Sequence, residues 1–79
     1  MMVLRPSIAR AARAYTGLGH IALAQMAGVA TRTVHKLEKD GRVTSSSLEK
    51  ITEVLRSQGV ELVRNDRGIV TGLSFGDKR

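Results

Sequence analysis

Polar and basic side chains gather along one short stretch of this chain, AGVATRTVHKLEK at residues 27–39. The spacing of Val34 and Leu37 is that of a helix with both side chains buried. Such a helix over residues 31–38 would expose five polar or basic side chains, which are Thr31, Arg32, Thr33, His35 and Lys36. Guanidinium, ammonium and hydroxyl groups donate hydrogen bonds, and the first two carry positive charge. This surface therefore has the chemistry to bind an anionic partner.

The positive charge is concentrated in the first half of the chain. The 79 residues include 13 Lys and Arg against seven Asp and Glu, which gives a formal net charge of +6. Residues 1–42 hold seven of the basic residues and only two of the acidic ones. Clustered Lys and Arg displace condensed counterions from phosphates, so this imbalance favours a nucleic acid as partner. A generically basic and merely soluble surface is the alternative.

The remaining composition argues against several other functions. The chain has no cysteine, and its two histidines, His20 and His35, have no acidic residue at the spacing of metal ligands. No nucleophile and base stand at a spacing typical of catalysis. We therefore expect no enzymatic activity, no cofactor and no metal. The longest apolar stretch is too short for a bilayer, so we expect a cytoplasmic, nucleoid-associated protein with no membrane partner.

Apolar residues recur at helical spacing in four segments. The first helix is predicted to begin at Pro6 and to end at Gly17, a natural C-cap. The second covers residues 20–27, the third 31–38, and the fourth extends to about Ser57. The side chains predicted to be buried are Ile8, Ala11, Ala12, Tyr15, Leu23, Ala24, Ala27, Leu48, Ile51, Val54 and Leu55, with Met26 filling the core.

The segment between the third and fourth helices is predicted to be a loop. It reads KDGRVTSS over residues 39–46, and its Asp-Gly pair is typical of a turn. One of Ser45, Ser46 or Ser47 is expected to cap the fourth helix, because a serine hydroxyl accepts from the free N–H groups at a helix start.

After Gly59 the apolar period changes from helical to alternating. VELV at 60–63 and GIVTGLSF at 68–75 flank RNDR, which predicts a β-hairpin. An isolated hairpin is barely stable in water, so it must pack on a second chain or on its own helices. We favour the second chain, which divides the protein into a helical unit, 1–58, and a dimerisation element, 59–79. The expected contacts are Val60, Leu62, Ile69, Val70 and Leu73.

The second and third helices, joined by a turn at Gly28, form a helix-turn-helix pattern in which Ala24 is small where the helices cross. The segment AGVATRTVHKLE resembles the A-G-V-x-x-x-T-V/I-x-x-L-E core of the lambda-repressor-like, or Xre, family of bacterial and phage regulators. This resemblance covers about residues 7–57. It implies a mainly α fold with a four-helix DNA-binding domain, followed here by the hairpin.

By this resemblance, the third helix is the recognition helix. Base edges in the major groove would be contacted by Thr31, Arg32, Thr33 and Lys36. Arginine and lysine donate to guanine O6 and N7, and a threonine methyl suits a thymine methyl. Phosphates would be contacted by His20, His35, Lys39, Arg42, Ser45 and Ser46. In the alternatives, Thr31 caps the third helix, His35 is only exposed to solvent, and the serines serve as caps.

Glu38 is an acidic residue in a helix that otherwise favours phosphate. In the family that AGVATRTVHKLE resembles, this position pairs with an arginine of the first helix, and Arg13 matches that partner. We therefore expect a largely buried ion pair between Arg13 and Glu38 with a structural role.

These features predict a sequence-specific DNA-binding transcriptional regulator, a repressor that binds a palindromic operator as a homodimer. The alternative is an antitoxin or accessory module that binds a toxin or other protein and regulates its own operon. A helix-turn-helix scaffold that has lost DNA binding is a third hypothesis, against which Arg32 and Lys36 argue.

Overall fold

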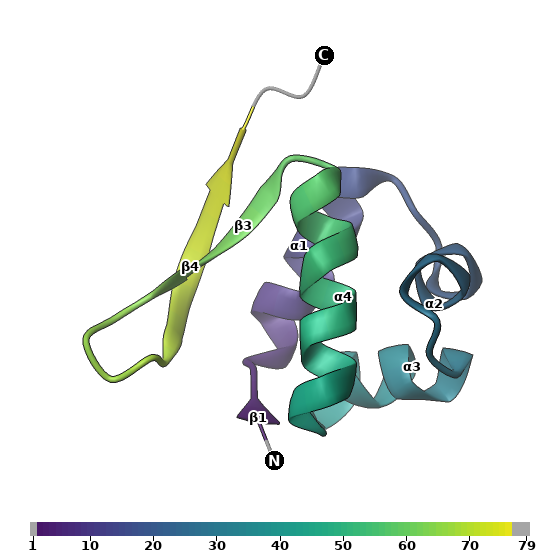
Figure 1. Cartoon of the computed structure of the whole chain (residues 1–79), viewed down its shortest axis with the longest axis horizontal. Helices are drawn as coiled ribbons and strands as arrows, with labels where there is room; N and C mark the ends of the chain where they lie inside the picture. Colours follow the sequence, from purple (N-terminus) through teal and green to yellow (C-terminus); the bar gives the residue numbers. More distant parts are fainter. Residues whose placement is uncertain (1, 77–79) are drawn as a thin grey trace.

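Four helices and two small antiparallel sheets make up the computed structural model over residues 2–76, the part of the chain that it describes (Figure 1). The helices are α1 (Pro6–Thr16), α2 (His20–Ala27), α3 (Thr31–Asp40) and α4 (Ser45–Ser57). Strand β1 (Met2–Val3) pairs with β2 (Arg42–Val43), and β3 (Val60–Arg64) pairs with β4 (Val70–Phe75). The prediction of a mainly α chain with a C-terminal hairpin is confirmed.

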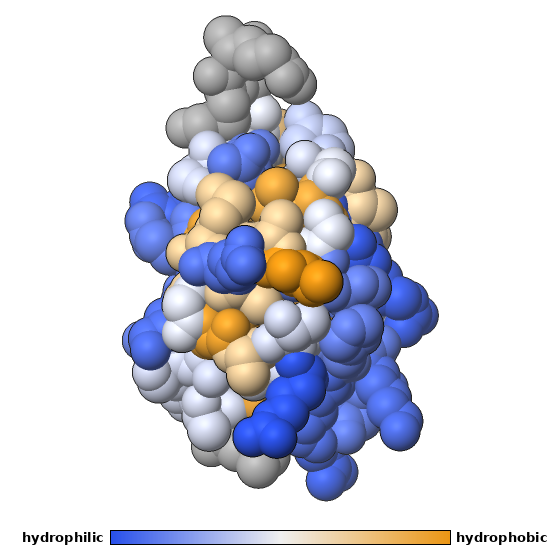
Figure 2. Space-filling model, turned by 90° about the vertical axis from the view of Figure 1, so that its right-hand side faces the viewer, coloured by the Kyte–Doolittle hydropathy of each residue, from blue (hydrophilic) through white to orange (hydrophobic). Residues whose placement is uncertain are grey.

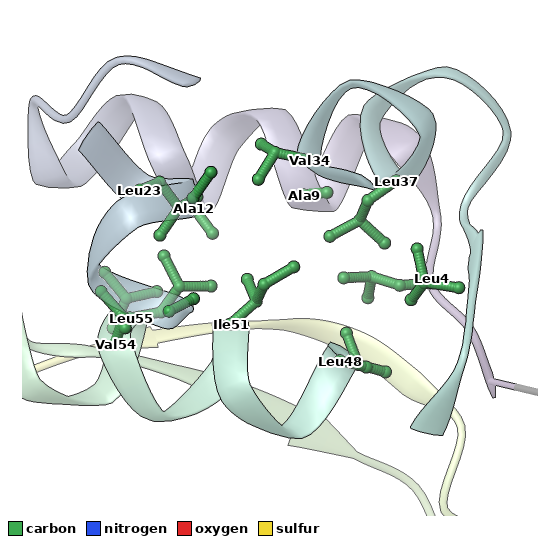
Figure 3. Packing of buried hydrophobic residues seen from close by; sticks show 14 of the residues in the cluster. Leu4, Ala9, Ala12, Leu23, Val34, Leu37, Leu48, Ile51, Val54 and Leu55 are labelled. Atoms are coloured by element: carbon green, nitrogen blue, oxygen red, sulfur yellow. The ribbon is translucent and has the colours of Figure 1, made fainter. Parts of the chain in front are cut away.

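The helices enclose an apolar core to which the hairpin also contributes. In Figure 3, leucine, isoleucine and valine side chains from α2, α3 and α4 converge on the alanines of α1. The buried apolar residues are Leu4, Ala9, Ala12, Leu23, Ala24, Ala27, Val34, Leu37, Val43, Leu48, Ile51, Val54, Leu55, Val60 and Val70. The faces predicted for α2 and α4 from helical spacing are thus confirmed.

The buried face of α1 differs from the predicted one. Ala9 and Ala12 are buried and Ile8 is half-buried, whereas Ala11 and Tyr15 are exposed. Alanines stand on both sides of this helix, so the spacing alone did not distinguish the two faces. The prediction for Met26 was also wrong, since its side chain is 51% exposed. The short helix α2 is apolar nearly all round but buries only one side.

The segment predicted as a loop between the third and fourth helices is largely regular structure. Helix α3 continues to Asp40, and β2 follows after Gly41. Gly41 has a φ of 78°, and a Cβ there would overlap the carbonyl oxygen of Leu4, whose N–H donates to the Gly41 oxygen at 2.9 Å. A glycine is therefore required where the N-terminal segment crosses the end of α3.

The start of α4 is capped one residue earlier than predicted. The cap is Thr44, whose hydroxyl accepts from the N–H of Ser47 at 3.1 Å. The serines at 45–47 instead form the first turn of the helix. At the start of α3, the N-cap is Ala30 with no side-chain cap, so the alternative in which Thr31 caps this helix was wrong.

The hairpin folds back on the helices of its own chain. Val60 and Val70 are buried in the core, and Leu62 and Leu73 pack against it half-buried. These four side chains therefore pack within their own chain, and the predicted dimer contacts at Val60 and Val70 are corrected: neither is available to a second chain. Ile69 is 53% exposed. Residues 77–79, the end of the predicted dimerisation element, lie outside the described residues.

Candidate functional site

An open groove with a volume of about 590 Å³ runs between the exposed side of α3 and the start of α4. Most of the side chains along it are basic or carry a hydroxyl group. The lining residues are Arg32, Thr33, His35, Lys36, Lys39, Asp40, Arg42, Val43, Thr44 and Ser47. The site therefore offers hydrogen-bond donors and positive charge on one accessible surface.

The helical periodicity of α3 places most of these basic and hydroxyl-bearing side chains on one side of the helix. Val34, Leu37 and Glu38 are buried beneath it, which turns Arg32 and Lys36 outward to solvent one turn apart. Thr31 and Thr33 are half-buried at the start of the helix. The structure thus brings three of the four predicted base-reading residues to the groove, all but Thr31.

The strand and helix that follow α3 form the second wall of the groove. Arg42 of β2 lies in this wall, and Lys39 lies at the end of α3. Both residues line the groove, and both were predicted to contact phosphates. Ser45 and Ser46 are exposed in the first turn of α4, but the hydroxyls that line the groove belong to Thr44 and Ser47. Sequence reasoning named Ser47 only as a candidate cap and missed Thr44, although threonine is a preferred residue at the N-cap of a helix.

Asp40 places one carboxylate among the cations of the groove. Its Oδ2 accepts from Lys36 Nζ at 2.9 Å, and its Oδ1 accepts from the Arg42 N–H at 2.9 Å. The hydrogen bond from Lys36, then that from the Arg42 backbone, lowers the pKa of Asp40. Within the part of the chain that the structure describes, neither Arg32 nor Lys39 has an ion-pair partner.

The predicted ion pair between Arg13 and Glu38 is present on the inner side of α3. Arg13 Nε donates to Glu38 Oε2 at 2.6 Å, and Arg13 Nη2 donates to Oε1 at 3.2 Å. Arg10 Nη1 donates to the Glu38 carbonyl oxygen at 2.7 Å. Burial by itself would raise the pKa of Glu38, but the hydrogen bonds from Arg13 and His20 more than offset this and lower it. The pair fixes the C-terminal half of α3 to α1.

His20 is half-buried, belongs to the cluster around Glu38 and does not line the groove. Its Nε2 lies 3.1 Å from Glu38 Oε1, a hydrogen bond when Nε2 carries the proton. Its ring stacks on that of His35 with the centroids 4.1 Å apart and the planes at 20°. His35 lies on the groove side of α3, so the stacked pair connects the start of α2 to the exposed surface. No sequence pattern indicated this contact between residues so far apart.

Apolar side chains are exposed on α2, next to this site. The face of the molecule drawn in Figure 2, which is the side occupied by α2 in Figure 1, has an apolar patch bordered by hydrophilic surface. Ile21 and Met26 of α2 are 63% and 51% exposed.

Among the described residues, no helix is long and apolar enough to cross a membrane.

No protein-family model matches the chain, and no curated protein matches it significantly.

Proposed function

We propose that this protein is a sequence-specific regulator that binds double-stranded DNA with α3. In this proposal α2, the turn at Gly28 and α3 form a helix-turn-helix of the lambda-repressor-like type. The observation that carries it is the groove in which Arg32, Thr33 and Lys36 stand beside Arg42 and the start of α4. An α-helix with its side chains fits into the major groove of B-DNA, and the N-terminus of an adjoining helix is a favourable site for a phosphate.

The groove residues take two kinds of role. Arg32 and Lys36 donate to guanine O6 and N7, and Thr33 places its methyl group against thymine. Lys39 and Arg42 bind phosphates on either side and set the register of the protein on the duplex. In the free protein, Asp40 lowers the positive charge of this surface through its bond with Lys36. On binding DNA, Lys36 exchanges this bond for one to a base or phosphate oxygen.

A single α3 reads too few base pairs to find one site in a genome. A homodimer with two α3 helices about one helical turn of DNA apart reads a palindrome, which supplies the missing information. Occupation of such an operator blocks transcription, so we propose a repressor.

In vitro selection of bound duplexes from a random pool tests this function. We expect enrichment of one palindromic sequence whose half-sites are related by twofold symmetry. The matched control is the Arg32→Ala variant, which keeps the other cations of the groove but should enrich a less defined sequence. Failure of the wild-type protein to enrich any sequence would overturn the proposal.

A second candidate function is a protein-binding module that also regulates its own operon. It is favoured by the exposed Ile21 and Met26, which the DNA-binding proposal does not use. Co-purification with the product of a neighbouring gene tests it. Binding that is lost in Ile21→Ser and Met26→Ser but kept in Arg32→Ala would support this function, and equal binding by all three variants would contradict it.

A further inference from the structure

The hairpin end of the molecule exposes apolar side chains that the proposed DNA contact does not use. Ile69 and Phe75 of the hairpin are 53% and 51% exposed. The ring of Tyr15, itself 47% exposed, lies against Phe75 with the ring centroids 4.4 Å apart. In Figure 1 the hairpin and α3 lie on opposite sides of α1 and α4, so this surface stays free when α3 is engaged.

Strand β4 has an open edge beside these aromatic rings. In the register of the hairpin, Val60 faces Phe75 and Leu62 faces Leu73. The N–H of Gly76 donates to the Gly59 oxygen at 2.7 Å. Because hydrogen-bonded and non-hydrogen-bonded pairs alternate along antiparallel strands, the backbone groups of Leu73 and Phe75 point away from β3. Within the described residues no other strand covers this edge.

Charged side chains, proline and β-bulges along an edge normally prevent strands from pairing between molecules. Residues 70–76 contain no charged side chain and no proline, whereas β3 carries Glu61 and Arg64. The one irregularity of the hairpin falls between Val63 and Arg64, opposite Thr71, and so leaves Leu73 and Phe75 in regular register.

Helix α1 extends the same surface without adding charge. Ala11 is exposed one turn before Tyr15 and so lies on the same side of the helix. Arg10 and Arg13 of this helix are instead bonded to Glu38 on the side toward α3. A small side chain next to the aromatic pair allows another helix to approach closely.

We propose that a second copy of this chain pairs with the β4 edge, antiparallel and about a twofold axis at Ser74. Leu73 of each copy then exchanges two hydrogen bonds with Phe75 of the other, which pairs the backbone N–H and C=O groups that point away from β3. Among the described residues, no charged side chain meets a like charge along this contact. A second copy fits better than a foreign strand because the pattern is complementary to itself. The proposal deepens the proposed function, since it names the surface that forms the DNA-binding dimer.

Disulfide trapping tests the register directly, because the chain has no cysteine of its own. At the axis, the two Ser74 residues would form a non-hydrogen-bonded pair with Cα atoms about 4.5 Å apart, within reach of a disulfide. We expect Ser74→Cys to yield a covalent dimer under mild oxidation. The matched control is Glu61→Cys, on the same outer side of the hairpin and opposite Ser74, which should remain mostly monomeric. Equal cross-linking of both variants, or none in Ser74→Cys, would overturn the proposal.

Sedimentation equilibrium of the unmodified chain gives an independent test. We expect a dimer whose dissociation constant rises at least about tenfold in Ser74→Lys, because two lysines then face each other at the axis. Val63→Lys, which adds the same charge to β3, should leave the constant unchanged. A wild-type chain that is monomeric at all concentrations would overturn the proposal.

Neither test contains DNA, so the two proposals fail separately. A trapped dimer that binds no duplex would contradict the proposed function alone. A monomer that still selects a defined half-site would contradict the dimer and leave the reading of DNA by α3 in place.

Discussion

The α3 groove and the hairpin edge expose opposite chemistry at two ends of one small molecule. The groove is lined by Arg32, Lys36 and Arg42, and Val43 is the one aliphatic residue among its lining residues. The β4 strand carries no charged residue and ends at an exposed aromatic ring that touches Tyr15. Binding at the first surface must weaken with salt, because it replaces counterions around phosphates, whereas pairing at the second must depend far less on salt.

The difference also lies in how each surface is held. A buried carboxylate beneath α3 ties the helix to α1 and α2, so the basic side chains project from a fixed backbone. The hairpin is held by apolar contacts at Val60 and Val70, which leave its outer edge without a partner in the described chain. A rigid polar surface suits the reading of a fixed DNA shape, and an open edge suits the addition of another strand.

The largest expected effect comes from removing the support of α3. Glu38→Ala should lower the free energy of unfolding by about 3 kcal/mol, because it leaves Arg13 partly buried without its carboxylate. Urea denaturation measures the loss. The control is Glu53→Ala, which removes an exposed ion pair with Arg56 and should change stability far less. Equal effects of the two variants would show that α3 is not held in this way.

Substitution in the groove should separate reading from general attraction. Arg32→Ala should weaken binding to the selected DNA by about 1–3 kcal/mol and relax its sequence preference. Arg42→Ala should weaken binding to all sequences alike and reduce the salt slope by about 1. Fluorescence titrations at several salt concentrations measure both. If both variants bind every duplex as the wild type does, α3 does not read DNA.

The contribution of Glu38 should depend on pH in a defined direction. Its pKa in the folded chain lies below the ordinary value of 4.5, so its stabilising effect is fully present above about pH 4.5 and is lost as the pH falls through the folded pKa. The difference in unfolding free energy between wild type and Glu38→Gln should therefore shrink as the pH falls below about 4.5. Urea titrations at a series of pH values measure it. A difference that grows as the pH falls below this value would contradict this account.

The smallest effect is expected at Asp40. Asp40→Asn should raise the affinity for all DNA sequences severalfold and steepen the salt dependence, since it removes a carboxylate from the groove and frees Lys36. Asp66→Asn makes the same change of charge in the hairpin turn and should raise the affinity for DNA less. Equal increases from both variants would mean that only net charge matters and that the groove has no special part.

Much of the helical architecture followed from the positions of apolar residues. Leu48, Ile51, Val54 and Leu55 define one side of α4, and Val34 with Leu37 defines the inner side of α3. The prediction failed where the residue type fits either environment, as with the alanines of α1, or where the partner is distant in the chain. The pairing of β1 with β2 and the bond from His20 to Glu38 are of this second kind.

The sequence by itself determined which side of α3 is open and that this side is basic, because helical geometry converts local spacing into opposite faces. It also determined that the C-terminal segment is a hairpin, because its apolar period is two. Only the tertiary structure decided that the hairpin packs on its own helices, and that Thr44, Ser47 and Arg42 join α3 in one groove. Those outcomes depend on which surfaces meet in three dimensions, and contacts between distant residues leave no periodic trace in a single chain.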